Sequence, residues 1–125
     1  MRLWAEQLIV HLDRPRLLGQ HRECCALRGL GWGRKHSTVD YVFVHSPLKL
    51  YRYHMLVVKE MQRRGYNVNE EWCHWRYRGQ RCEAWPIEIF EDDSRLGNVI
   101  YPEHNETYLQ ECLQNLRGKG LNLIK

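Results

Sequence analysis

Three stretches of the chain carry the start and stop signals of α-helices, and they restrict the fold more than any other feature. Asp13 and Ser46 are capping residue types, and a proline follows each within two residues, where the first turn of a helix tolerates it. Glycine, which readily ends a helix, follows each stretch. These patterns predict helices over residues 14–28, from Pro47 to just before Gly65, and over 103–117.

Apolar residues recur at helical spacing in the second and third of these stretches. In the second they predict a core-facing stripe made of Tyr51, Met55, Val58 and Met61. In the third the stripe comprises Tyr108, Leu109, Cys112, Leu113 and Leu116. Residues 29–40 are predicted to form a loop, because they carry three glycines and a cluster of basic residues. A long irregular connection is predicted over 69–100, because that segment shows no clean period. A chain of 125 residues is expected to form one compact domain, 1–125.

The charge is distributed unevenly along the chain. Residues 1–64 hold 12 of the 19 Lys and Arg and 5 of the 15 Asp and Glu, a net charge of +7, whereas residues 65–125 carry −3. A basic half of this kind is typical of a polyanion-binding face, because each Lys or Arg set against a phosphate releases a counterion. A solvated surface is the alternative interpretation, and charge alone does not separate the two.

Several functional classes are disfavoured. No apolar run reaches the length of a membrane span, and we expect no secretory signal and a cytoplasmic protein, associated with the nucleoid when bound to DNA. The glycine-rich loop at 29–40 lacks the spacing that cradles a nucleotide phosphate. Five cysteines, two of them adjacent, favour a reducing compartment. Cys73, His74 and Cys82 lack the paired spacing of a zinc site, so we expect neither a metal nor another cofactor.

The N-terminal residues, taken together with the first predicted helix, suggest a chemistry. An α-amino group titrates near 8, below lysine, so part of it is neutral and nucleophilic at pH 7, and Arg2 and Arg22 would lower its pKa further. An amine that attacks a sugar C1′ expels the base and leaves a Schiff base. Such a reaction also needs a carboxylate, which Glu23 supplies. An Arg-Glu pair on a helix is nevertheless most often a solvated surface feature.

Three motifs carry a resemblance to a known family: Leu17-Leu18-Gly19-Gln20-His21-Arg22-Glu23, Arg34-Lys35-His36, and Glu60-Met61-Gln62-Arg63-Arg64-Gly65-Tyr66-Asn67. Together they resemble the pyrimidine-dimer DNA glycosylases. The resemblance covers residues 1–68 well and 101–117 loosely. It implies an all-α fold with the N-terminus threaded between helices.

The resemblance also implies an activity, which is excision at cyclobutane pyrimidine dimers in duplex DNA followed by nicking of the abasic site. The terminal amine of Met1 would be the nucleophile, because Arg2 blocks removal of the methionine, and Glu23 would handle protons at the sugar. Side chains that would contact DNA are Arg2, Arg16, Arg22, Arg34, Lys35, His36 and Arg117. The expected partner is damaged double-stranded DNA, bound by a monomer.

The chain departs from the family pattern at four places. The family's prototype exposes a small residue by removing its initiator methionine, whereas the bulky Arg2 is expected to keep Met1 in place here. Arg16 stands where the family has a histidine, and Ala26 stands where it has an arginine, whose role Arg28 is a candidate to take over. The family's aromatic C-terminal tail is absent. Its role in contacting DNA could pass to residues 72–77, where aromatic and basic side chains alternate. The other interpretation of that segment is a set of aromatics covering a small core.

Two alternatives to this function remain open from the sequence. One is a non-catalytic nucleic-acid-binding module that uses the same basic face. The other is the same mechanism directed at a different base lesion. Glu23 separates the first alternative from catalysis, because a carboxylate within a phosphate-binding face costs binding energy unless chemistry requires it.

Overall fold

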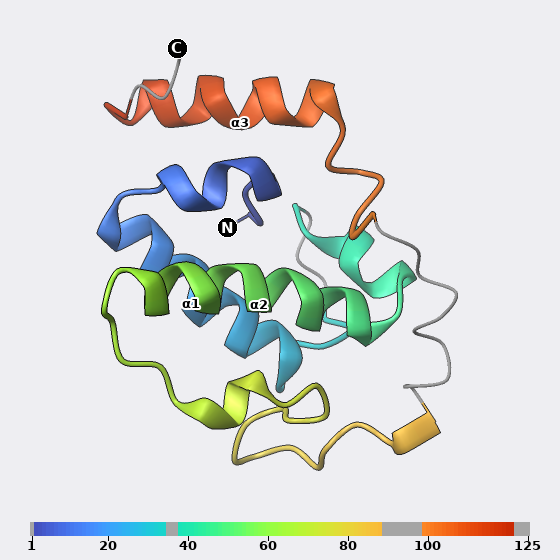
Figure 1. Cartoon of the computed structure of the whole chain (residues 1–125). Coiled ribbons are helices and arrows are strands. Elements are labelled where there is room, and N and C mark those ends of the chain that lie inside the picture. The colour runs from blue at the N-terminus through green and yellow to red at the C-terminus, as the bar shows by residue number, and fades with distance from the viewer. Residues whose placement is uncertain (1, 35–37, 89–98, 122–125) are drawn as a thin grey trace.

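A computed structural model describes residues 2–34, 38–88 and 99–121. These residues form three α-helices, α1 (Arg14–Arg28), α2 (Pro47–Arg63) and α3 (Glu106–Gly118), together with three short 3-10 helices, η1 (Glu6–His11), η2 (Asp40–Val44) and η3 (Glu70–Cys73). No strand occurs in the described ranges. The expected all-α fold with three main helices is therefore confirmed (Figure 1).

Helices α1 and α2 begin and end where their local signals place them. The Ser46 hydroxyl accepts a hydrogen bond from the Leu48 amide at 3.2 Å, which caps α2, and Gly65 follows the helix with a φ of +84°. Asp13 precedes α1 as its N-cap residue, but its side chain does not cap the helix. The carboxylate instead accepts a hydrogen bond from Arg16 at 2.7 Å.

The buried face of α2 differs from the predicted stripe. Val58 and Met61 are buried as expected, whereas Tyr51 and Met55 are only half-buried. The most deeply buried residues on this helix are Leu50, Tyr53, His54, Val57 and Val58. The predicted stripe was partly wrong because α2 packs against α1 and η1 together, and two neighbours cover a wider face than one apolar stripe.

The N-terminal segment, residues 2–5, runs through the middle of the protein. Figure 1 shows this segment and η1 between α3 and the pair of α1 and α2. Leu3 and Ala5 are fully buried, and Trp4 is nearly so. The apolar side chains of the segment thus join the three helices into one core.

Helix α3 is shifted by a few residues from its predicted range of 103–117. It begins at Glu106, because the Asn105 side chain caps it by accepting a hydrogen bond from the Tyr108 amide at 3.0 Å. Gly118 lies inside the helix rather than behind it. The left-handed residue that follows the helix is Gly120, whose φ is +88°.

Arg28, at the end of α1, links the irregular segment after α2 to helices α1 and α2 through hydrogen bonds. Its five N–H groups donate to the carbonyls of Trp72, His74 and Tyr77 and to Nδ1 of His54, at 2.7–3.1 Å. Only 1% of its surface is exposed. This burial contradicts the expectation that Arg28 takes over the role of the arginine replaced by Ala26, because none of its N–H groups is left for another partner.

A buried carboxylate anchors the end of α2. The Glu60 side chain accepts hydrogen bonds from Arg63 at 2.5 and 2.8 Å and from Arg64 at 2.6 Å. These hydrogen bonds lower the pKa of Glu60 to about 2, and those from Arg63 contribute most. Burial of the carboxylate acts in the opposite direction and raises the pKa. Arg64 also donates to the Val10 carbonyl at 3.1 Å, so the cluster links α2 to η1.

This lowered pKa predicts an acid-dependent loss of stability. At neutral pH, Glu60→Gln should lower the free energy of unfolding by about 1.5–3 kcal/mol, because hydrogen bonds to a charged group are lost. A carboxyl group whose pKa is lowered in the folded state stabilises the fold at pH values above its ordinary pKa of about 4.3. This stabilisation is lost as the pH falls toward 2. Urea unfolding of both proteins should show their difference shrinking between pH 4 and pH 2. A difference that stays constant over this range would contradict the assignment.

Candidate active site

A pocket of about 400 Å³ lies where the N-terminal segment, α1 and α3 meet. Its polar and charged lining comes from all three elements. The residues that line it are Arg2, Trp4, Pro15, Arg16, Gly19, Gln20, Glu23, Thr38, Asn115 and Lys119. The pocket therefore brings the start of the chain together with a helix more than one hundred residues further along.

Helical spacing explains which side chains reach the pocket. Residues 16, 19, 20 and 23 of α1 are separated by three or four positions, so they share one face of the helix. Asn115 lies one turn before Lys119 at the end of α3 and so shares its side. Arg2 and Trp4 both contribute because alternate residues of an extended segment point to the same side.

The pocket is rich in cations. Arg2, Arg16 and Lys119 line it together with one carboxylate, Glu23, whose Oε1 is shielded from solvent. The Arg2 guanidinium lies 5.6 Å from the Trp4 ring centroid, and Lys119 Nζ lies 5.4 Å from it. Arg16 is partly neutralised by its ion pair with Asp13. These cationic side chains favour the binding of a phosphate or another anion in the pocket.

The predicted site residues divide into three groups. Arg2, Arg16 and Glu23 line the pocket together. Arg22, Arg34 and Arg117 are exposed and do not line it. Met1, Lys35 and His36 lie outside the described residues.

Sequence reasoning missed two polar residues of α3 that line the pocket. Lys119 lies in the lining, whereas the predicted Arg117 does not. Oδ1 of Asn115 is shielded from solvent and has no hydrogen-bond partner among the residues that the structure describes, which leaves an acceptor for a ligand's N–H or O–H group. The helical period of the sequence could have pointed to both residues, because Asn115 and Lys119 lie beside the buried face formed by Cys112 and Leu116.

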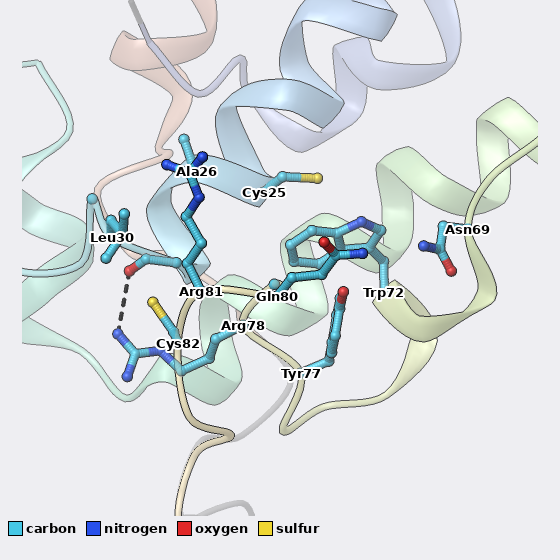
Figure 2. Close-up of a pocket in the computed structure, with 13 residues that line it drawn as sticks. Cys25, Ala26, Leu30, Asn69, Trp72, Tyr77, Arg78, Gln80, Arg81 and Cys82 are labelled. Carbon is cyan, nitrogen blue, oxygen red and sulfur yellow. Dashed lines mark hydrogen bonds between the residues drawn. The ribbon is translucent and has the colours of Figure 1, made fainter.

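A second pocket, of about 550 Å³, opens beyond the end of α1 (Figure 2). Cys25 and Ala26 line it from α1, and Trp72, Tyr77 and Arg81 line it from the irregular segment. The Trp72 ring packs edge-on against Tyr77, and its centroid lies 5.0 Å from the buried Arg28 guanidinium carbon. Trp72 nevertheless lines the pocket. The interpretation of residues 72–77 as aromatics that cover a small core agrees with these contacts, whereas their contact with DNA stays a prediction.

His21, Cys25 and His54 form a cluster that sequence reasoning did not consider, with ligand atoms within 4.8 Å of one another. Arg28 can only donate, so the network assigns His54 Nδ1 as an acceptor and places the proton on Nε2, which lies 2.8 Å from His21 Nδ1. Burial raises the pKa of Cys25 to about 12, which favours the thiol. A metal ion would bind the lone pair of His54 Nε2, which would move the proton to Nδ1 and set it against the N–H groups of Arg28. The cluster is therefore better suited to a chain of hydrogen bonds than to a metal ion.

Comparison with known proteins identifies one family. A model of the pyrimidine dimer DNA glycosylase family matches residues 1–74. The match spans α1 and α2 and includes Arg2 and Glu23, whereas α3 lies beyond it. Neither the curated proteins nor the solved structures give a significant match.

Proposed function

The chain belongs to the pyrimidine dimer DNA glycosylase family, and on this premise we propose that it excises damaged bases from duplex DNA and then cleaves the resulting abasic site. Cyclobutane pyrimidine dimers are the proposed lesion. The observation that carries the proposal is the presence of Arg2 and Glu23 in one cation-rich pocket. It favours catalysis over a binding module, because Glu23 weakens phosphate binding.

In the proposed reaction the neutral α-amine of Met1 attacks C1′ of the damaged nucleotide. The bond from C1′ to the pyrimidine breaks, and the pyrimidine takes up a proton but stays joined to its partner through the cyclobutane ring. The C1′–O4′ bond then breaks with protonation of O4′, which opens the sugar and leaves an iminium between C1′ and the protein. Loss of a C2′ proton to the Glu23 carboxylate then expels the 3′ phosphate by β-elimination. Consecutive Cα atoms are about 3.8 Å apart, so an amine at position 1 would be within reach of the pocket that Arg2 lines.

Cationic side chains around the pocket are proposed to hold the DNA backbone. Arg2, Arg16 and Lys119 line the pocket itself, and Arg22 is exposed on the same helix as Glu23. The remaining proposed contacts are made by Arg34, Lys35, His36 and Arg117. Binding should weaken steeply with salt, because each phosphate contact releases a counterion.

Borohydride trapping tests the proposal. Incubation with a duplex containing an abasic site or a cyclobutane dimer, followed by reduction, should give a covalent protein–DNA adduct, which peptide mapping should locate on Met1. Acetylation of the α-amine should abolish the adduct while leaving the dissociation constant for DNA within about twofold, because one blocked amine removes a single contact.

Lys119 provides the internal control, because among the described residues that line the pocket it alone carries a primary amine. A Lys119→Met variant should still form the adduct. An adduct mapped to Lys119 would refute the role of Met1. Salt-dependent DNA binding without trapping on either duplex would instead support a non-catalytic binding module, and trapping only on other lesions would change the substrate.

A further inference from the structure

The N-terminal segment is held by side chains rather than by secondary structure. Residues 2–4 belong to no helix or strand, so their backbone groups have no regular hydrogen-bond partners. Nevertheless the segment is enclosed by the core, where an unpaired backbone group is costly. One side chain from each α-helix provides the missing partners.

Gln20 of α1 holds the segment from one side. Its Oε1 accepts a hydrogen bond from the Trp4 amide at 2.7 Å, and its Nε2 donates to the Arg2 carbonyl at 3.0 Å. Only 3% of Gln20 is exposed. A single buried amide thus pairs with a donor and an acceptor two residues apart, which fixes both the position and the direction of the backbone.

Two tyrosines hold the segment from α2 and α3. The fully buried Tyr53 hydroxyl donates to the Trp4 carbonyl at 2.5 Å and lies 2.9 Å from Gln20 Oε1, so its one proton is shared between them. The Tyr108 hydroxyl donates to the Leu3 carbonyl at 2.5 Å. The carbonyls of three consecutive residues, 2, 3 and 4, are therefore each bound by a different helix.

We propose that Gln20, Tyr53 and Tyr108 are positioning residues that hold the backbone of residues 2–4 in one conformation and thereby present the preceding α-amine to the Glu23 pocket. The inference rests on the proposed function, and the three residues act through the backbone that they hold, although Gln20 also lines the pocket. Apolar burial of Leu3 and Ala5 keeps the segment inside the protein but does not set its direction. The three side chains set it through hydrogen bonds.

Tyr108→Phe gives the sharpest test, because it removes one hydroxyl and keeps the ring that stacks on His104. The rate of adduct formation on an abasic duplex under single-turnover conditions should fall about tenfold to a hundredfold, because a nucleophile misplaced by about 1 Å loses rate on that scale. The dissociation constant for DNA should change by less than about twofold, because no phosphate contact is removed. Hydrogen exchange of the amides of residues 3–5 should become faster.

Tyr51→Phe is the matched control, because the Tyr51 hydroxyl donates to the Cys73 carbonyl at 2.9 Å, an equivalent bond away from the segment. Both variants should lose similar thermal stability, but only Tyr108→Phe should lose rate. Tyr53→Phe should repeat the loss of rate. Trapping by the wild-type protein with an unchanged rate in Tyr108→Phe would overturn the positioning role alone, and failure of the wild-type protein to trap would overturn the proposed function with it.

Discussion

Replacing Glu23 with glutamine is expected to slow cleavage of the glycosidic bond and strand nicking by about 10²–10⁴-fold, the usual contribution of a general acid or base. Glutamine keeps the size of the side chain but cannot accept a proton from the sugar. Binding of the duplex should be maintained or become slightly tighter, because a negative charge is removed from a pocket lined by Arg2, Arg16 and Lys119. Single-turnover rates on a dimer-containing duplex, measured with dissociation constants, separate the two effects.

Glu111→Gln provides the control for this prediction, since Glu111 is an exposed carboxylate on α3 and does not line the pocket. It removes the same charge from the protein and should leave the rate unchanged. A Glu23→Gln protein that retained more than about a tenth of the wild-type rate would remove this carboxylate from the mechanism. Equal losses in both variants would indicate an effect of net charge alone.

The largest effect on stability is expected at Arg28. Arg28→Met should lower the free energy of unfolding by at least about 3 kcal/mol, because a buried acceptor left unsatisfied costs about 1–3 kcal/mol and several lose their donor together. These acceptors are the carbonyls of Trp72, His74 and Tyr77 and Nδ1 of His54. Urea unfolding measures the loss, and tryptophan fluorescence should report the release of Trp72.

Two further variants define the cause of this loss. Arg14→Met changes an exposed arginine at the other end of α1, whose guanidinium lies 5.0 Å from the Tyr66 ring centroid, and should cost less than about 1 kcal/mol. Arg28→Lys keeps the charge but offers three donors in place of five, so its loss should be intermediate. Equal stability of Arg28→Met and Arg14→Met would show that the hydrogen bonds of Arg28 contribute little.

The helix positions could be predicted because their signals are local. Ser46 and Gly65 mark the ends of α2 through the backbone of their immediate neighbours. Burial is not local, which is why Tyr51 was expected in the core in place of Tyr53. Arg28 shows the same limit, since an arginine on a helix becomes buried only when carbonyls from a distant segment surround its donors.

Part of the candidate site could also be predicted. The sequence alone made Glu23 a weak candidate, and the family resemblance paired it with the N-terminus, whose residue Arg2 does line the same pocket. Lys119 and Asn115 were missed because periodicity marks the buried face of α3 but does not say which residues beside that face share a pocket with the N-terminal segment and α1. Gln20 was quoted only as part of a motif, since its role depends on where the backbone of residues 2–4 runs.

The pocket joins segments that lie more than one hundred residues apart in the sequence, and this has a consequence for folding. Residues 2–4 and α1 supply one wall, whereas Tyr108 and Asn115 of α3 and the following Lys119 approach from the other side. A partly folded chain in which α3 has not docked would therefore carry Glu23 without the wall that this helix supplies. Under the proposed mechanism such a form would be inert toward DNA, so cleavage would require the complete core.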